Sequence, residues 1–412
     1  MMCYMFWVDT NFAIARAERN LSMSNRIPEA AQTNAFERGL TRRHLARVAS
    51  MMAAGALPLF TEASFAQTSA GTRPKAMPPD AVRIDLNEYP EGPCPDAVQA
   101  VAAIARFGNR YRPHSEQQEL IETAAESEGL KPNYISIGIG STDPLRAAAI
   151  AFTSPAHSLV TADPVYETAG RTAEMMGVKV HRIPLRTSDY AHDVRAMVQA
   201  DSSAGLFYIC SPNNPTGTVT SKEDIDYLLA NKPKGAVLLL DEAYIQFAME
   251  RSPAIDLVAA DKDIIVLRTF SKIYGMAGLR VGLALGRPDL LQKMRPWIGS
   301  QSLFPITAIA AATASLKTKG FVAARRTANT EARESTLEFL ESKKFTYIKG
   351  AQCNNFMIDV KRPGMDVIQA LARKKVYICQ RMFPIYPTHV RVGVGSQEEM
   401  KKFQAAFLEV MA

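Results

Sequence analysis

Short apolar runs alternate with longer helical patterns along the chain from residue 81 onward. Seven runs are apolar almost throughout, as expected of strands buried on both faces, and they cover residues 134–139, 159–161, 178–183, 205–210, 236–240, 264–268 and 280–285. Helical patterns lie between them, for example at residues 143–152, with Asp143 as the expected N-cap and Pro144 as the next residue, and at residues 166–176, closed by Gly177. This alternation predicts an α/β fold with a mainly parallel sheet.

The pattern changes after about residue 305. A long helical stretch at residues 321–341 precedes three strand-like runs, and further helical patterns cover residues 365–373 and 397–411. We therefore expect a large domain at residues 115–305 and a smaller α+β domain at residues 306–412. The N-terminal segment, residues 81–114, is expected to join the smaller domain.

The first 66 residues have the pattern of a targeting segment. Arg42, Arg43 and Arg47 form a positive region, and the 13 residues from Val48 to Phe60 are uncharged, too few to span a bilayer. The Arg-Arg pair followed by His-Leu resembles a twin-arginine export signal, and small residues up to Ala66 suit cleavage. We expect residues 1–66 to be a leader, residues 67–80 a linker, and the protein to be periplasmic without a stable membrane anchor. If the leader does not function, for example as a short amphipathic helix with an accidental Arg pair, the protein is expected to be cytoplasmic.

Composition excludes several functional classes. The 412 residues are 47% apolar and 22% charged, which is ordinary for a globular enzyme. The five cysteines are scattered without a C-x-x-C spacing, and the six histidines lack H-x-x-H spacings, which argues against a disulfide scaffold and a zinc hydrolase. The net charge of +7 is spread along the chain, so we expect no nucleic-acid partner; it favours anionic small molecules or simply reflects a basic surface.

Three polar clusters follow predicted strands. Their sequences are FYICSPNNPTG at residues 207–217, AVLLLDEAY at 236–244 and VLRTFSKIYGMAGLRVG at 266–282. Ligands of open parallel sheets bind outside the carboxyl ends of the strands, so these side chains are expected to meet in one crevice. A lysine there can form a Schiff base, an aspartate can keep a pyridine nitrogen protonated, and serine, threonine and arginine can bind phosphate. These are the requirements of pyridoxal phosphate.

The same motifs carry a family resemblance. SPNNPTG, DEAY and T-x-S-K followed by an arginine eight residues later resemble, in combination and order, the class I/II aminotransferases of pyridoxal-phosphate fold type I. The histidinol-phosphate aminotransferase branch is the most similar, and the likeness extends from about residue 85 to the C-terminus. It implies a large domain with a mainly parallel seven-stranded sheet, a smaller α+β domain, and a homodimer with shared active sites.

The resemblance also implies roles for individual residues. Lys272 corresponds to the lysine that forms the Schiff base with pyridoxal phosphate and then acts as general acid and base. Asp241 corresponds to the partner of the pyridinium nitrogen, Tyr244 and Asn214 to the residues that bind the ring hydroxyl, and Tyr166 to the aromatic residue that stacks on the ring.

Further positions match phosphate and substrate contacts. The positions expected at the cofactor phosphate are Thr269, Ser271, Arg280, Ser141 and Thr142, the last two at a helix N-terminus, with Tyr111 reaching the neighbouring subunit's site. The positions expected at the substrate are Tyr89, Asn355, Arg381 and Arg391, of which Arg381 lies in a loop that differs from the family pattern. No metal site is expected.

The predicted reaction is transfer of an amino group from an amino acid or amino-alcohol phosphate to a 2-oxo acid, with 2-oxoglutarate as the expected acceptor. Two alternatives remain open at this point. Similar sequences include pyridoxal-phosphate-dependent decarboxylases and lyases, because the bond that breaks depends on substrate orientation, which sequence does not define. The second alternative is a non-catalytic protein that binds pyridoxal phosphate.

Overall fold

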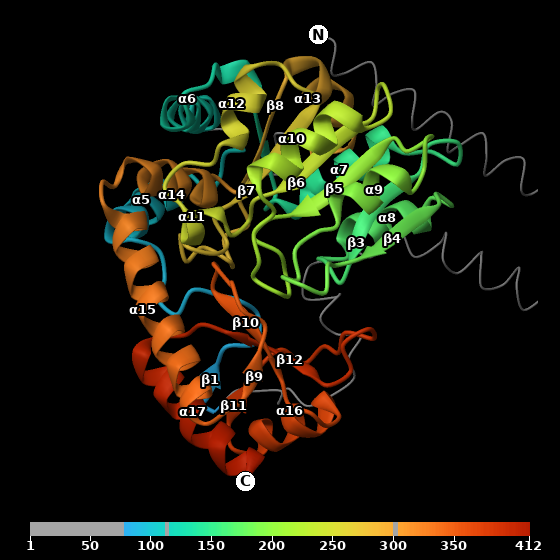
Figure 1. The fold of residues 1–412 in the computed structure, drawn as a ribbon. Helices are drawn as coiled ribbons and strands as arrows, with labels where there is room; N and C mark the ends of the chain where they lie inside the picture. The colour runs from blue at the N-terminus through green and yellow to red at the C-terminus, as the bar shows by residue number, and fades with distance from the viewer. Residues whose placement is uncertain (1–77, 112–114, 300–303) are drawn as a thin grey trace, which may run out of the picture. The chain divides into compact units, whose positions relative to one another are not determined.

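The computed structural model describes residues 78–111, 115–299 and 304–412 (Figure 1). The predicted leader, residues 1–66, and most of the predicted linker lie outside this part of the chain. Within it, no helix combines the length and apolar character needed to cross a membrane.

A seven-stranded sheet forms the centre of the larger part of the fold. Its strands are β2 (Ile135–Gly138), β3 (Leu159–Asp163), β4 (Val180–Pro184), β5 (Leu206–Cys210), β6 (Val237–Asp241), β7 (Ile264–Thr269) and β8 (Gly282–Gly286). The order is β2-β8-β7-β6-β5-β3-β4; strands β3 to β7 pair in parallel, and β8 is antiparallel to both neighbours. All seven predicted runs form strands, so the predicted mainly parallel sheet is confirmed.

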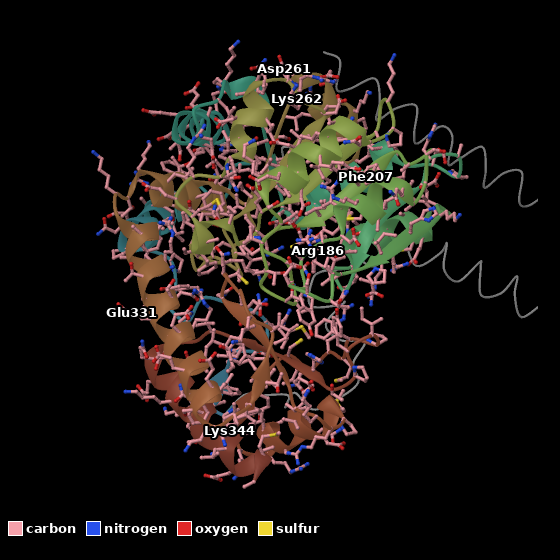
Figure 2. All side chains as sticks on the ribbon, viewed as in Figure 1. Arg186, Phe207, Asp261, Lys262, Glu331 and Lys344 are labelled. Atoms are coloured by element: carbon pink, nitrogen blue, oxygen red, sulfur yellow. The ribbon has the colours of Figure 1, made fainter. Side chains whose placement is uncertain are left out.

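Burial on both faces explains why these strands lack a polar alternation. Every residue of β5, β6, β7 and β8 is buried. Phe207, labelled in Figure 2, is 0% exposed. Since both faces are covered, apolar side chains are favoured at successive positions rather than at every second one.

Helices connect and flank the strands. They are α6 (Glu116–Glu128), α7 (Thr142–Phe152), α8 (Thr168–Met175), α9 (Val194–Gln199), α10 (Lys222–Asn231), α11 (Ile245–Ala248), α12 (Ala254–Ala259) and α13 (Pro288–Met294), with short 3₁₀ turns η1 (Pro132–Tyr134) and η2 (Arg295–Trp297). The expected N-cap of α7 was wrong, because Ser141 occupies that position. The Asp143 carboxylate instead accepts hydrogen bonds from the Ile139 and Gly299 amides, both at 3.2 Å.

A second apolar core is built from the two ends of the described chain. Its elements are β1 (Val82–Arg83), β9 (Thr346–Tyr347), β10 (Asn355–Asp359), β11 (Val376–Tyr377), β12 (His389–Gly393), α15 (Phe321–Ser342), α16 (Gly364–Arg373) and α17 (Gln397–Met411). Strand β1 pairs in parallel with β11, while β10 lies between β12 and β9 in an antiparallel sheet. The Ser396 side chain and Glu399 form a capping box at the start of α17.

Two helices differ from the expected domain organisation. α5 (Pro95–Ala105) lies in the segment expected to join the smaller domain, and α14 (Ile306–Lys317) follows the expected boundary at residue 305. Both contribute side chains to the larger core, where they pack against each other. The reason is that α14 is rich in alanine and buried on most sides, so it fits between neighbouring helices rather than covering a small sheet.

Candidate active site

The ends of β5 and β6 place one carboxylate deep in the fold. Asp241 is the last residue of β6 and is 2% exposed. The Tyr208 hydroxyl donates to its Oδ2 at 3.0 Å, and the Ala243 amide donates to its Oδ1 at 3.1 Å. Two donors on different elements therefore fix the carboxylate plane. Tyr208 was not anticipated, because in the sequence it is one apolar residue in a buried strand.

Lys272 is in the loop that follows β7, and its amine lies next to Tyr244. Its Nζ donates to the Leu86 carbonyl at 3.2 Å and lies 5.6 Å from the centre of the Tyr244 ring. Tyr244 comes three residues after Asp241, so the structure brings the predicted lysine and the predicted DEAY motif together. The segment after β1 supplies the carbonyl that holds the amine.

The Tyr244 hydroxyl is bound by two amides. Asn87 Nδ2 donates to it at 3.2 Å and Asn214 Nδ2 donates at 3.4 Å. Burial raises the pKa of Tyr244 well above its usual value, with nearby Arg391 acting in the opposite direction. The phenol is therefore neutral at physiological pH and keeps its proton for donation. Asn87 was missed; its left-handed backbone, with φ of 53°, is a conformation that asparagine tolerates.

Arg391 and Asn355 present buried polar groups from paired strands of the smaller core. Arg391 donates from Nη1 to Asn214 Oδ1 and from Nη2 to the Asp85 carbonyl, both at 2.7 Å. Its Nε and the Asn355 Oδ1 are buried without a hydrogen-bond partner among the residues that the structure describes. Buried polar atoms without partners are costly, so their presence here suits a site that a polar ligand completes.

A second cluster joins the loop after β7 to the start of α7. Arg280 Nη1 donates to Ser271 Oγ at 3.1 Å, and the Ser271 amide donates to Thr269 Oγ1 at 3.1 Å. Gly140 has a φ of +67°, and a Cβ at this position would collide with the Arg280 guanidinium. The guanidinium therefore packs against the loop just before α7. The structure thus brings the predicted phosphate residues Thr269, Ser271 and Arg280 against the loop that leads into Ser141 and Thr142.

Comparison with known proteins identifies the family. The family described as aminotransferase class I and II matches residues 79–407. The chain belongs to this family. It is 32% identical over 337 residues to the histidinol-phosphate aminotransferase of Moorella thermoacetica, covering 81% of this chain and 86% of that protein. It is 33% identical over 329 residues to histidinol-phosphate aminotransferase 1 of Nitrosococcus oceani, covering 78% and 87%.

The fold agrees with a solved aminotransferase structure. The histidinol-phosphate aminotransferase of Sinorhizobium meliloti, solved in complex with pyridoxal-5'-phosphate, superposes with a TM-score of 0.75 at 23% identity, covering 87% of this chain and 97% of that chain. Together, the family and its relatives show that the protein is a pyridoxal-phosphate-dependent aminotransferase.

The residues of this aminotransferase fit that cofactor. Pyridoxal phosphate carries an aldehyde, a basic ring nitrogen, a ring hydroxyl and a phosphate, and each needs a different partner. The cluster offers the amine of Lys272, the buried carboxylate of Asp241, the hydroxyl of Tyr244 with its amide partners, and the serine, threonine and arginine groups before α7. The unpartnered Arg391 Nε and Asn355 Oδ1 are suited to binding a polar substrate.

Other predicted residues of the aminotransferase lie in different surroundings. Tyr89 packs against Phe247, with ring centres 6.3 Å apart, and under the Arg325 guanidinium at 4.3 Å, and its hydroxyl donates to the Arg325 carbonyl at 3.4 Å. Tyr89 is thus held beside α11 and α15. Tyr111 is 78% exposed and borders residues that the structure does not describe.

Two further predicted residues lie close together on facing segments. Tyr166 is partly buried against the larger core, and the next residue, Glu167, is the N-cap of α8. Arg381 forms an ion pair with Glu167. The predicted substrate residue Arg381 is therefore already paired with a carboxylate, which the sequence did not indicate.

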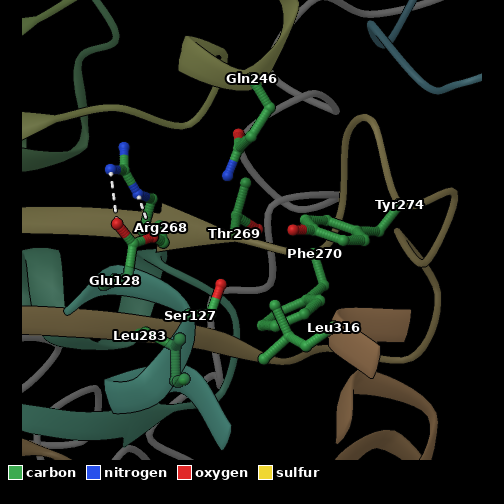
Figure 3. Close-up of a pocket in the computed structure, with 10 residues that line it drawn as sticks. Ser127, Glu128, Gln246, Arg268, Thr269, Phe270, Tyr274, Leu283 and Leu316 are labelled. Carbon is green, nitrogen blue, oxygen red and sulfur yellow. Dashed lines mark hydrogen bonds and ion pairs between the residues drawn. The ribbon is translucent and has the colours of Figure 1, made fainter. Parts of the chain in front are cut away.

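A buried ion-pair network supports the strand that leads to Lys272. Arg268 is 4% exposed and forms an ion pair with Glu242. It forms a second ion pair with Glu128 at 3.3 Å, which Figure 3 shows. With Gln246 it lines a small cavity of about 10 Å³. Glu242 also accepts a hydrogen bond from Ser252. The register of β6 and β7 explains this pair: Asp241 is opposite Leu267, so the next residues, Glu242 and Arg268, are neighbours.

Proposed function

We propose that this aminotransferase transfers an amino group from an amino acid or amino-alcohol phosphate to a 2-oxo acid, with Lys272 as its covalent and proton-transferring residue. The observation that carries the proposal is the placement of the Lys272 amine against the Tyr244 ring, in the same buried cluster as Asp241. Bound pyridoxal phosphate supplies an electron sink for the bonds at the substrate's Cα.

Asp241 is proposed to hold the ring nitrogen in its protonated form. A carboxylate is suited to this task when it is ionised, oriented and shielded from water. The Tyr208 hydroxyl and the Ala243 amide provide the orientation, and burial in β6 provides the shielding. Since both donors already orient the carboxylate in this structure, we propose that the site is preorganised.

Lys272 is proposed to move the proton from the substrate's Cα. The Leu86 carbonyl, which accepts from the amine at 3.2 Å, gives Lys272 a resting position near the Tyr244 ring, where it would reach a bound coenzyme. Tyr244, whose phenol is neutral, is proposed to donate to the cofactor's ring oxygen, with Asn214 as the second donor. Asn214 is linked in turn to Arg391, so the cofactor and substrate contacts share one amide.

Arg391 is proposed to bind the substrate's carboxylate or phosphate. Its guanidinium is held by Asn214 and the Asp85 carbonyl, so little side-chain entropy is lost on binding. The Arg391 Nε and the Asn355 Oδ1 provide an unpartnered donor and an unpartnered acceptor on the paired strands β12 and β10. The relatives at 32% and 33% identity are histidinol-phosphate aminotransferases, which supports a donor of the amino-acid or amino-alcohol phosphate type.

A direct test combines a spectrum with a transfer assay. Lys272→Ala should remove the visible absorbance of the lysine-bound coenzyme and abolish formation of glutamate from 2-oxoglutarate with any amino donor. The control is Lys262→Ala, at the exposed lysine labelled in Figure 2, which should retain both. A Lys272→Ala protein with normal turnover would overturn the mechanism, and a wild-type protein that releases CO₂ instead of forming glutamate would favour a decarboxylase.

We also propose a homodimer in which Tyr111 contacts the cofactor phosphate of the neighbouring subunit. The 78% exposure of Tyr111 in the single chain leaves its side chain accessible to a partner. Tyr111→Phe should weaken cofactor retention by about tenfold, as expected for loss of a hydrogen bond to a charged group, while light scattering shows a dimer in both proteins. A monomeric, fully active wild-type protein would contradict the proposal.

Finally, we propose that residues 1–66 direct export by the twin-arginine route, on the basis of Arg42 and Arg43 and the short apolar stretch after them. Replacing both arginines by lysine should leave the protein in the cytoplasmic fraction, whereas the unchanged protein should be recovered from the periplasm. Equal distribution of both proteins would refute the export proposal.

A further inference from the structure

The loop between β11 and β12 places a cation beside the start of α8. Arg381, in this loop, forms an ion pair with Glu167, and their side chains are 41% and 14% exposed. Glu167 lies next to Tyr166 in the sequence, and its other oxygen lies 3.8 Å from Arg171, one turn along α8. The Glu167 carboxylate is therefore shared by two guanidinium groups, with Arg381 the nearer one.

This ion pair lies on segments that border the proposed substrate site. The Cys379 amide donates to the Arg391 carbonyl at 3.2 Å, so Arg381 follows closely on a segment paired with Arg391. Further along the same loop, Tyr386 packs edge-on against Tyr190, with ring centres 5.8 Å apart. The Arg381 loop thus contacts the start of α8, which follows β3, and Tyr190, whose carbonyl accepts a hydrogen bond from Thr218 in the loop after β5.

We propose that Glu167 is a specificity-determining residue, which competes with anionic side chains for Arg381 and so narrows the proposed donors toward those whose distal end is uncharged. This inference rests on the proposed function. An anionic group that reaches Arg381 must share the guanidinium with the Glu167 carboxylate, and two like charges at hydrogen-bond distance from one cation repel each other. An uncharged distal end meets no such repulsion.

The burial of Glu167 strengthens this argument. At 14% side-chain exposure, Glu167 is less hydrated than its partner, so its charge is screened less by water and acts more strongly on a nearby anion. Arg171 reduces this field only partly, because it lies farther away. Removal of the Glu167 charge should therefore help a doubly charged phosphate more than a singly charged carboxylate.

The test compares donors that differ only in charge. We would measure kcat/KM of the holoenzyme for glutamine against glutamate, and for histidinol against histidinol phosphate. Glu167→Gln should raise the ratio of anionic to uncharged donor by about tenfold in the first pair, and by more in the second. The matched control is Glu174→Gln, on the same helix and paired with Arg182 at 2.7 Å, which should change both ratios by less than about twofold.

The opposite substitution gives an independent result. Arg381→Gln leaves Glu167 without its nearer cation, so a donor with a cationic side chain, such as ornithine, should gain about tenfold relative to glutamine. Unchanged ratios in both variants, or an equal loss with every donor, would overturn the inference and make the ion pair purely structural. A wild-type protein that reacts with none of the donors would instead overturn the proposed function.

Discussion

His192 is buried in its neutral form, and this makes the stability of the protein depend on pH in a calculable way. The side chain is 0% exposed, with Nδ1 2.9 Å from the Thr220 hydroxyl. Within the described part of the chain, its Nε2 has no hydrogen-bond partner. Burial, assisted by the Arg186 charge and opposed by Asp224, lowers the pKa of His192 from 6.5 to about 3.

The direction in which stability changes with pH depends on whether the folded or the unfolded chain binds the proton. Above pH 6.5 the imidazole is neutral in both the folded and the unfolded chain, so it adds no pH dependence. Between pH 6.5 and about 3 only the unfolded chain binds the proton, so stability falls as the pH falls through this window. At pH 5 the unfolded state gains about 2 kcal/mol from this one group, since each pH unit below 6.5 is worth about 1.4 kcal/mol.

The substitution His192→Asn removes the titrating group and keeps a polar atom near the position of Nδ1. Urea unfolding of wild type and variant at pH 8 and pH 5 should show that the wild type loses about 2 kcal/mol more than the variant between the two values. Other titrating groups are common to both proteins and cancel. His157→Asn, at an exposed histidine, is the matched control. Equal losses in wild type and His192→Asn would refute the assignment.

Three further predictions concern the site and its support. Tyr208→Phe removes a hydrogen bond to the Asp241 carboxylate and should lower kcat/KM at least tenfold, whereas unfolding in urea should change little; an unchanged kcat/KM would contradict the role of this bond. Glu242→Gln leaves the buried Arg268 short of negative charge and should lower the free energy of unfolding by about 3 kcal/mol, measured in urea; a change under 1 kcal/mol would contradict it. Gly282→Ala should lower stability by about 1–3 kcal/mol and weaken cofactor affinity, measured by titration, because its Cβ would collide with the backbone before α7.

The sheet could be predicted well because its signal is local. Seven runs of consecutive apolar residues form seven strands, because a strand that is buried on both faces needs apolar residues at successive positions. The membership of α5 and α14 could not be predicted in the same way. Both are short helices rich in alanine, and their own sequences do not specify which core they will contact. That choice depends on surfaces distant in sequence.

The site shows the same division. Lys272, Asp241 and Tyr244 could be found because each follows a strand in a recognisable motif. Asn87 and Glu167 act through partners far away in the sequence, and neither has a local pattern that indicates its contacts. Tyr89 and Tyr111 were selected by resemblance alone; Tyr89 hydrogen-bonds the Arg325 carbonyl, Tyr111 is exposed, and their expected roles stay predictions.

The pairing of β1 with β11 has a consequence for synthesis of the protein. Strand β1 is among the first described residues to be synthesised, whereas its partner β11 is among the last. Strand β1 therefore has no β11 to pair with during most of translation. Asn87, which follows β1 and donates to the Tyr244 hydroxyl, accepts a hydrogen bond from Asn354, which is also made late. Because every strand of the larger sheet precedes β11 in the chain, we expect truncation before residue 376 to keep the strands of that sheet but to remove the β1–β11 pairing and the activity.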